Sequence, residues 1–299
     1  MNLRNYRLVI SDLDGTLVEY GSDRLSPGVE TAVARLREQG MRFTIATGRS
    51  WKQTRPIAQA LGVTVPVILQ AGAIVFDPVA ERVLRQIQLR PDIDEQLQDI
   101  LDHDSLETAN AVDQFCLDES GAYHATIIRT EGGKWLHERS GERCLLNRDY
   151  AGAVVKHFFT GPEQALKNLS VRIHQEVQPR PNMILWPPDR ESYDWSLEVF
   201  DPDASKGQAL QWLVSQQGLK MKQVLAFGDG FNDLDMLQGA GLGVAMKGAP
   251  DLVRAKADRV IPGPEEDGIA RFLNGEIAGV CERKPLLRRL AGMVFTNQN

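Results

Sequence analysis

Acidic side chains follow two apolar runs of this sequence, and their spacing suits the chemistry of phosphoryl groups. Asp12 and Asp14 come just after the first run, two residues apart, so in an extended chain their side chains lie on one side. Asp229 and Asp233 follow the second run, residues 224–227. Carboxylates this close repel one another unless a hard cation such as Mg²⁺ binds between them. An ordinary Asp-Gly turn gives the same letters at each place, so either pair alone is a weak signal.

A hydroxyl and a lysine add to these acids. Thr47 follows another apolar run, residues 43–46, and Lys206 lies at the start of a predicted helix. Together these groups supply a nucleophile, a proton carrier, donors for the transferred oxygens and a metal site, which phosphoryl transfer needs. Two competing interpretations fit less well. The nearby glycine pairs do not continue into a dinucleotide-binding fingerprint, and Phe231 stands where a calcium-binding loop needs an oxygen ligand.

Strands alternating with helices must bring these side chains to one edge of a sheet. Apolar runs that do not alternate predict strands buried on both faces, at residues 8–10, 43–46, 65–69, 224–227 and 243–246. Helices between them are predicted to begin at Ser26, Ser50 and Ser205. Pro56 predicts a kink or a break in the second of these helices. This order predicts an α/β fold with a doubly wound parallel sheet, in which ligands bind at the carboxyl ends of the strands.

Between about residues 86 and 196 the pattern changes to short strands and turn-rich polar connections, such as residues 131–133. The strands predicted there are residues 125–129, 153–159 and 183–186, and the helices lie near residues 91–103 and 162–177. We therefore expect residues 86–196 to form an inserted α+β domain, with residues 1–85 and 197–299 as a discontinuous core.

The composition indicates an ordinary soluble globular protein. Of its 299 residues 42% are hydrophobic and 25% charged, and the length suggests about two domains. The net charge of −6 gives no general attraction to nucleic acid or to an anionic membrane, so neither is an expected partner. Three scattered cysteines without CxxC spacing indicate reduced thiols. The sequence has no signal-peptide or membrane-span pattern, so we expect a cytoplasmic protein, as a monomer or small homo-oligomer.

Two further features are expected to be structural. His124, His137 and His157 have no metal-ligand spacing, which favours surface or core positions. The basic amphipathic tail, residues 282–289, is expected to form a solvated helix docked on the core.

Four segments of this chain, taken in order, resemble motifs I to IV of the haloacid dehalogenase superfamily. They are residues 12–17 (DLDGTL), 46–49 (ATGR), 205–207 (SKG) and 227–233 (FGDGFND). Their order, their spacing and the large insert between the second and third resemble the Cof-like phosphatases with a type IIB cap. The resemblance implies a Rossmann-like core whose inserted cap selects the substrate.

The resemblance also implies a role for each acidic residue. Asp12 would attack phosphorus and form an aspartyl-phosphate, while Asp14 would protonate the leaving oxygen and later activate water. Asp229 would bind Mg²⁺ together with the Asp12 carboxylate and the Asp14 carbonyl. Asp233 would support the ion directly or through its waters.

The remaining motif residues are implied in phosphate binding. Thr47 and Lys206 would hold the phosphoryl oxygens, and Gly48 and Arg49 belong to the same phosphate-binding motif as Thr47. Asn232 would contact the phosphate or Lys206.

One departure from the family pattern concerns the turn after the third strand. Members often carry Asn-Gly there, and this chain has Ala71 and Gly72. The pattern then lacks one side-chain donor to the substrate phosphate, which concerns the substrate class and the rate and leaves the nucleophile untouched.

The expected activity is Mg²⁺-dependent hydrolysis of a small soluble phosphomonoester, with sugar phosphates ahead of phosphoglycerates and cofactor phosphates. A phosphomutase would share the core but keep its phosphoryl group, so a lack of released phosphate would identify one. A phospho-accepting signalling module also combines Asp, Thr and Lys residues, but it needs only about one small domain and no acid–base residue beside its nucleophile. The insert and Asp14 argue against such a module.

Overall fold

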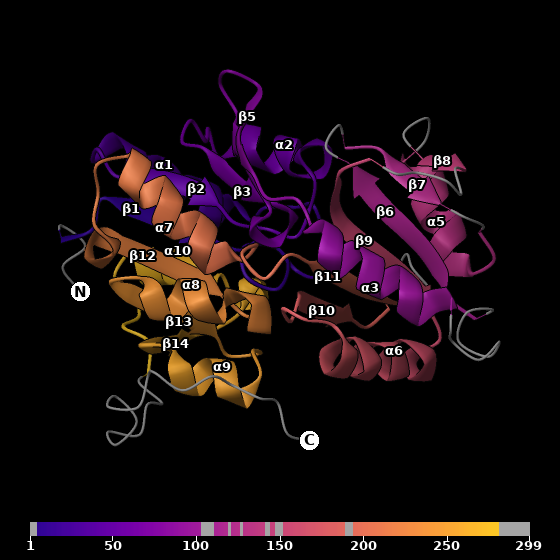
Figure 1. Cartoon of the computed structure of the whole chain (residues 1–299). Coiled ribbons are helices and arrows are strands. Elements are labelled where there is room, and N and C mark those ends of the chain that lie inside the picture. The colour runs from indigo at the N-terminus through magenta and orange to yellow at the C-terminus, as the bar shows by residue number, and fades with distance from the viewer. Residues whose placement is uncertain are drawn as a thin grey trace.

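The computed structural model describes residues 5–102, 111–118, 121–125, 128–140, 144–146, 152–188 and 194–280. In these residues the strands form sheets of five, six and three strands. Figure 1 places the five-stranded sheet and its helices in one half of the molecule and the six-stranded sheet in the other. Among the helices of the described ranges, none combines the length and the hydrophobicity that crossing a membrane requires.

The five-stranded sheet is parallel throughout and has the order β14-β13-β12-β1-β2. Its strands are β1 (Leu8–Ser11), β2 (Arg42–Ile45), β12 (Val224–Gly228), β13 (Leu242–Met246) and β14 (Arg259–Ile261). The chain moves from β1 outward to β2 and later returns on the other side of β1 with β12. The predicted doubly wound parallel sheet is therefore confirmed, and its topological switch point, where such folds bind ligands, lies between β1 and β12.

Helices cover both faces of this sheet. On one face lie α1 (Pro27–Glu38), α2 (Trp51–Ala60) and α10 (Gly268–Leu273), and on the other lie α7 (Lys206–Gln216), α8 (Leu234–Gly239) and α9 (Asp251–Lys256). Side chains of β1 alternate between them, because Val9 packs into the first cluster while Leu8 and Ile10 pack into the second. The predicted start of α1 is confirmed, since the Ser26 side chain accepts the Val29 N–H at 3.1 Å.

The third predicted strand differs from a simple parallel continuation. β3 (Val67–Leu69) meets β2 through one parallel bridge, between Ala46 and Ile68, and then pairs antiparallel with β4 (Ile74–Asp77). β4 in turn pairs antiparallel with β5 (Arg82–Gln86). The connections are too short for the crossover that a parallel pair needs, which explains the change of direction.

Of the kink or break predicted at Pro56, the break is wrong, because α2 runs through this residue from Trp51 to Ala60. A proline removes the hydrogen bond to the carbonyl four residues earlier, here that of Lys52. Lys52 and Pro56 both lie on the exposed side of the helix, where water can satisfy this carbonyl.

The insert contains a six-stranded sheet with the order β10-β11-β9-β6-β7-β8. Its strands are β6 (Asp113–Asp118), β7 (Tyr123–Ala125), β8 (Cys144–Leu146), β9 (Val154–Gly161), β10 (Asn182–Trp186) and β11 (Trp195–Phe200). The predicted helices are confirmed as α3 (Pro91–Asp102) and α6 (Glu163–Glu176), which share one apolar cluster with this sheet. β11 belongs to this sheet as far as Phe200, so the predicted boundary after residue 196 falls inside a strand. The division of the chain into domains stays a prediction.

Two local predictions in the insert are wrong. The strand expected at 125–129 shares only Ala125 with β7 (Tyr123–Ala125), since residues 128–129 form no strand and residues 126–127 lie outside the described ranges. The connection expected at 131–133 begins α5 (Glu131–Ser140). Helix α5 has glycines in its first turn because a Cβ at Gly132 would lie 2.1 Å from the Thr160 hydroxyl. Close packing on the sheet thus overrides the low helix propensity of glycine. The predicted tail helix at 282–289 lies outside the described residues.

Candidate active site

The two acidic strand ends lie side by side at the switch point. β1 and β12 are adjacent and in register, with Ser11 opposite Phe227, so Asp12 directly follows β1 and Asp229 directly follows Gly228, the last residue of β12. The Asp12 N–H donates to the Phe227 carbonyl at 3.0 Å, which continues the ladder to this point. The side chains of both aspartates are buried. The sheet itself therefore brings two carboxylates together in a region that excludes water.

Lys206 joins this pair from the start of α7. Its Nζ lies 2.7 Å from Asp12 Oδ1 and 2.6 Å from Asp233 Oδ1, and the side chain is fully buried. Burial alone would lower the pKa of Lys206, but the two carboxylates outweigh this effect and raise the pKa above its usual value. The ammonium group is therefore a permanent positive charge between two strand ends.

The turn after β3 holds the start of α7 in place. Gly72 has φ +107°, and a Cβ there would lie 2.2 Å from the Ser205 carbonyl oxygen. Only glycine permits this approach of the two backbones. Ala71, at φ +53°, is also left-handed, and it belongs to a buried apolar cluster that includes Val155 and Phe200 of the six-stranded sheet. Where the family often has asparagine, this chain therefore has a methyl group in apolar surroundings.

Three carboxylates form a group that could hold a metal ion. Ligand oxygens of Asp12, Asp229 and Asp233 lie within 4.8 Å of one another, and no other such group occurs in the described part of the chain. Burial raises the pKa of Asp12, against the opposing effect of Lys206, and Asp233 and Asp229 raise it further. Burial and the Asp233 charge likewise raise the pKa of Asp229. Three carboxylates around one ammonium group leave uncompensated negative charge, which a cation would neutralise.

The turn that carries Asp233 is held by its own carboxylate. Asp233 Oδ2 accepts the N–H groups of Asp229 at 3.0 Å and Gly230 at 2.9 Å, while Oδ1 accepts from Lys206. Both oxygens of Asp233 are thus engaged. Asn232 is half-buried on the same turn, and a Cβ at Gly230 would lie 2.4 Å from its side-chain oxygen. The structure has no hydrogen bond between Asn232 and Lys206, both of which are described residues.

The segment after β2, residues 47–49, reaches the same edge of the sheet, but Thr47 and Arg49 make different contacts there. Thr47 is buried, its N–H donates to the Ile68 carbonyl at 2.9 Å, and its hydroxyl accepts the Arg49 N–H at 3.1 Å. Gly48 has open space where a Cβ would be. The Arg49 guanidinium donates to both oxygens of Asp14, at 2.8 and 2.5 Å. The structure therefore places Arg49 against the carboxylate of Asp14, whereas Thr47 stays at the strand end.

Sequence reasoning missed three side chains of this site. Thr16 donates to Asp229 Oδ1 at 2.6 Å, and the Tyr20 hydroxyl donates to Asp229 Oδ2. Asp23 accepts from Arg49. Thr16 lies inside the first motif and could have been included, whereas the contacts of Tyr20 and Asp23 depend on the path of the loop between β1 and α1.

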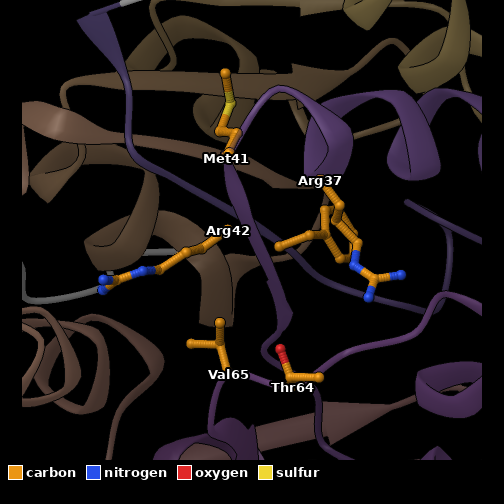
Figure 2. A pocket seen from close by; sticks show the side chains of 7 residues that line it. Arg37, Met41, Arg42, Thr64 and Val65 are labelled. Carbon is orange, nitrogen blue, oxygen red and sulfur yellow. The ribbon is translucent and has the colours of Figure 1, made fainter.

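A cavity of about 290 Å³ lies elsewhere, at the amino-terminal end of β2. Arg37, Met41, Arg42, Thr64 and Val65 are among the residues that line it. Figure 2 shows the guanidinium groups of Arg37 and Arg42 pointing away from one another. They donate to the Leu61 carbonyl and the Gln217 side chain. The cavity is separate from the acidic edge, which lies at the carboxyl ends of the strands.

Comparisons with known proteins agree with this geometry. Residues 9–273 match the family of haloacid dehalogenase-like hydrolases. A pyridoxal phosphate phosphatase of Escherichia coli is 31% identical over 281 residues, which cover 89% of this chain and 97% of that protein. A 5-amino-6-(5-phospho-D-ribitylamino)uracil phosphatase of Bacillus subtilis is 29% identical, with 89% and 96% covered. An HMP-PP phosphatase of Serratia proteamaculans is 30% identical, with 90% and 94% covered.

Solved structures share the whole fold. A haloacid dehalogenase-like hydrolase of Bacteroides thetaiotaomicron has a TM-score of 0.73 at 22% identity, covering 91% of this chain and 100% of that one. A subclass IIB sugar phosphatase has a TM-score of 0.71 at 20% identity, with 90% and 98% covered. These likenesses extend over the parallel sheet and the insert together.

Proposed function

The chain belongs to the haloacid dehalogenase superfamily, as a phosphatase of its Cof-like, subclass IIB group, and from this premise we propose that it hydrolyses a small phosphomonoester with Mg²⁺ and an aspartyl-phosphate intermediate on Asp12. The observation that carries the proposal is the buried group at the switch point, in which Asp12, Asp229 and Asp233 lie together and Lys206 contacts Asp12 and Asp233. Its chemistry suits transfer of a negatively charged group.

In the first step an Asp12 carboxylate oxygen attacks phosphorus. The new bond is an acyl phosphate, the bond between phosphorus and the ester oxygen breaks, and the leaving oxygen takes a proton from Asp14. We assign this proton transfer to Asp14 because it follows Asp12 by two residues at the same strand end.

In the second step a water molecule gives a proton to Asp14 and attacks phosphorus. The acyl phosphate bond breaks, inorganic phosphate leaves, and the carboxylate of Asp12 is restored. Arg49 donates to both oxygens of Asp14, so its guanidinium is already engaged by this carboxylate. Arg49 therefore fits a role in holding Asp14 between the two steps better than a direct role in binding phosphate.

Donors for the phosphoryl oxygens come from two segments. We assign the Lys206 ammonium and the Thr47 hydroxyl to this role, with the backbone of Gly48 open beside them. Asn232 has no fixed partner in the described residues and is placed in the same role as a lesser contributor.

The carboxylates fit an Mg²⁺ ion, because they are oxygen ligands, buried, and close enough to share one ion. A bound ion would supply positive charge for the phosphoryl oxygens. We assign Asp12 and Asp229 as ligands, with the Asp14 carbonyl as a third. Asp233 already accepts from Lys206 and two backbone N–H groups, so it fits indirect support better than direct ligation.

We propose a small phosphorylated metabolite as the substrate, with sugar phosphates as the first expectation. The named relatives are phosphatases of pyridoxal phosphate, of a ribitylamino uracil phosphate and of HMP-PP, and a structural neighbour is a sugar phosphatase. The panel for testing must therefore contain both sugar phosphates and phosphates of heterocyclic alcohols.

The test is phosphate release from such a panel with Mg²⁺ and with excess chelator. We expect turnover of at least one ester with Mg²⁺ and none in chelator, with activity restored by added Mg²⁺. Full turnover in chelator would contradict the metal assignment. Transfer of the phosphoryl group without release of phosphate would identify a phosphomutase.

A further inference from the structure

Tyr20 is an exposed aromatic residue with a buried partner. Its side chain lies in the connection between β1 and α1, and the residue is 56% exposed. Its hydroxyl nevertheless donates to Asp229 Oδ2, in the buried acidic group. The hydroxyl of a mostly exposed side chain thus reaches a buried carboxylate, and this contact points to a role for the hydroxyl at Asp229.

The backbone holds the ring of Tyr20 in this position. Gly15 has φ +77°, and a Cβ there would lie 2.4 Å from the Tyr20 ring and 2.5 Å from Asp229 Oδ2. The ring therefore lies directly against the Cα of Gly15. The Gly15 N–H donates to the Val18 carbonyl at 2.8 Å, which closes a tight turn just before Tyr20.

The same connection is fixed at a second point. Arg49 donates to the carboxylate of Asp23 and, at 3.1 Å, to the carbonyl of Ser22. Arg49 also holds Asp14, so Arg49 binds the chain both before and after Tyr20. Tyr20 is thus held over Asp229 by contacts that do not involve its own hydroxyl.

The hydroxyl completes the orientation of Asp229. Thr16 donates to Oδ1 at 2.6 Å and Tyr20 donates to Oδ2, so the carboxylate has one donor on each oxygen. Each carboxylate oxygen has two lone pairs, which leaves one on each for a cation. Two donors fix the plane of the carboxylate, and hydrogen bonds of this kind to a metal ligand govern its affinity for the ion.

We propose that Tyr20 is a positioning residue of the metal site, whose hydroxyl orients the Asp229 carboxylate toward the ion. This inference rests on the proposed function, because it requires that Asp229 bind a divalent cation. The ring is held by Gly15, so Tyr20→Phe removes the donor and keeps the packing. We expect the dissociation constant for the ion to rise about 10-fold or more in this variant.

The experiment measures Mn²⁺ binding to the full-length protein without substrate, by the electron paramagnetic resonance signal of the free ion. It compares the parent with Tyr20→Phe, Asp229→Asn and Tyr6→Phe. Tyr6 precedes β1 at the opposite edge of the sheet, so Tyr6→Phe makes the same chemical change away from the site. We expect parent affinity in Tyr6→Phe, weaker binding in Tyr20→Phe, and loss of the site in Asp229→Asn.

The outcomes separate the inference from the proposed function. If Asp229→Asn loses the ion and Tyr20→Phe binds it as tightly as the parent, the role of Tyr20 is overturned and the metal site stands. If the parent itself binds no ion, the proposed function fails. A purely structural role for Tyr20 would lower the melting temperature of Tyr20→Phe and leave its Mn²⁺ affinity unchanged.

A titration of turnover with Mg²⁺ gives a second readout. Tyr20→Phe should need about 10-fold more Mg²⁺ for half-maximal rate and should approach the parent rate at saturation. A lower saturating rate with an unchanged Mg²⁺ requirement would contradict a role in metal affinity.

Discussion

The two large sheets both contain buried charges, but they balance them differently. At the edge of the parallel sheet three carboxylates, those of Asp12, Asp229 and Asp233, lie together, and one ammonium group, that of Lys206, contacts the first and the third. In the six-stranded sheet three buried ionisable side chains each have one matched partner, and the buried carboxylate of Asp113 accepts the N–H groups of Arg129 and Thr130. Lys156 pairs with Glu198, His157 Nε2 lies 2.6 Å from Asp94, and His124 Nε2 lies 2.8 Å from Asp118.

This difference distinguishes a ligand-binding site, at the edge of the parallel sheet, from a structural framework, in the six-stranded sheet. A buried charge with a good partner needs nothing further, and its pair serves to hold strands and helices in register. Glu198 on β11 illustrates this, because it also accepts the Trp186 indole N–H of β10 at 3.1 Å. The acidic edge of the parallel sheet has uncompensated negative charge, which a bound cation would neutralise. Sequence reasoning expected surface or core roles for the histidines, and the buried pairs of His157 and His124 agree with that.

The two regions also shift carboxyl pKa values in opposite directions. The hydrogen bond from His157 lowers the pKa of Asp94, so this residue stabilises the fold above the pKa of the unfolded chain and loses that contribution as the pH falls. Burial raises the pKa of Asp12 and Asp229. Without a cation, the folded state therefore loses stability as the pH rises from the carboxyl pKa of the unfolded chain to the higher pKa of the folded protein. A bound cation should therefore stabilise the protein most in neutral solution, where these carboxyls would otherwise resist ionisation.

The largest expected effect is that of Asp12→Asn on turnover. Loss of the nucleophile should lower turnover by on the order of 10⁴-fold or more. The melting temperature in chelator should not fall, because the amide removes one negative charge from a crowded group and Lys206 keeps Asp233. A clear drop in the melting temperature would mean that the acidic edge is balanced like the six-stranded sheet, and the comparison would fail.

The same chemical change in the six-stranded sheet should act on stability. Glu198→Gln leaves the ammonium of Lys156 buried without its carboxylate, and breaking such a pair costs about 3–5 kcal/mol of unfolding free energy. The matched control is Glu176→Gln, in the exposed pair with Arg172 on α6, which should cost less than about 1 kcal/mol. Urea unfolding of both variants measures these differences. Equal losses of unfolding free energy in the two variants would show that burial does not make the Lys156–Glu198 pair more important for stability than an exposed pair.

Local patterns made most of the core predictable. Apolar runs that end in Asp12, Thr47 and Asp229 identify strands and their carboxyl ends, and these three residues do meet at one edge. Contacts made by the loops between strands and helices could not be predicted from the sequence. The hydroxyl of Tyr20 on Asp229 and the guanidinium of Arg49 on Asp14 depend on how the loop after β1 turns back over the site.

The insert was harder to predict for a different reason. Its register is set by packing between elements, as Gly132 of α5 against Thr160 illustrates, and short strands such as β7 carry little periodicity of their own. Ala71 is a similar case. Its departure from the family pattern was visible in the sequence, whereas its place in an apolar cluster with residues of the six-stranded sheet was not.

The central claim is that the two aspartates of the first strand end divide the work, with Asp12 as nucleophile and Asp14 as acid and base. Asp14→Asn should lower overall turnover by about 10²–10⁴-fold, because it cannot exchange protons. With an aryl phosphate whose leaving group needs no proton, its first step should be spared more than its second. The direct measurement is acid quenching during such turnover, followed by mapping of the phosphorylated residue. We predict phosphate accumulating on Asp12 in Asp14→Asn and none in Asp12→Asn, whereas equal phosphoenzyme in both variants, or label on another residue, would contradict this assignment.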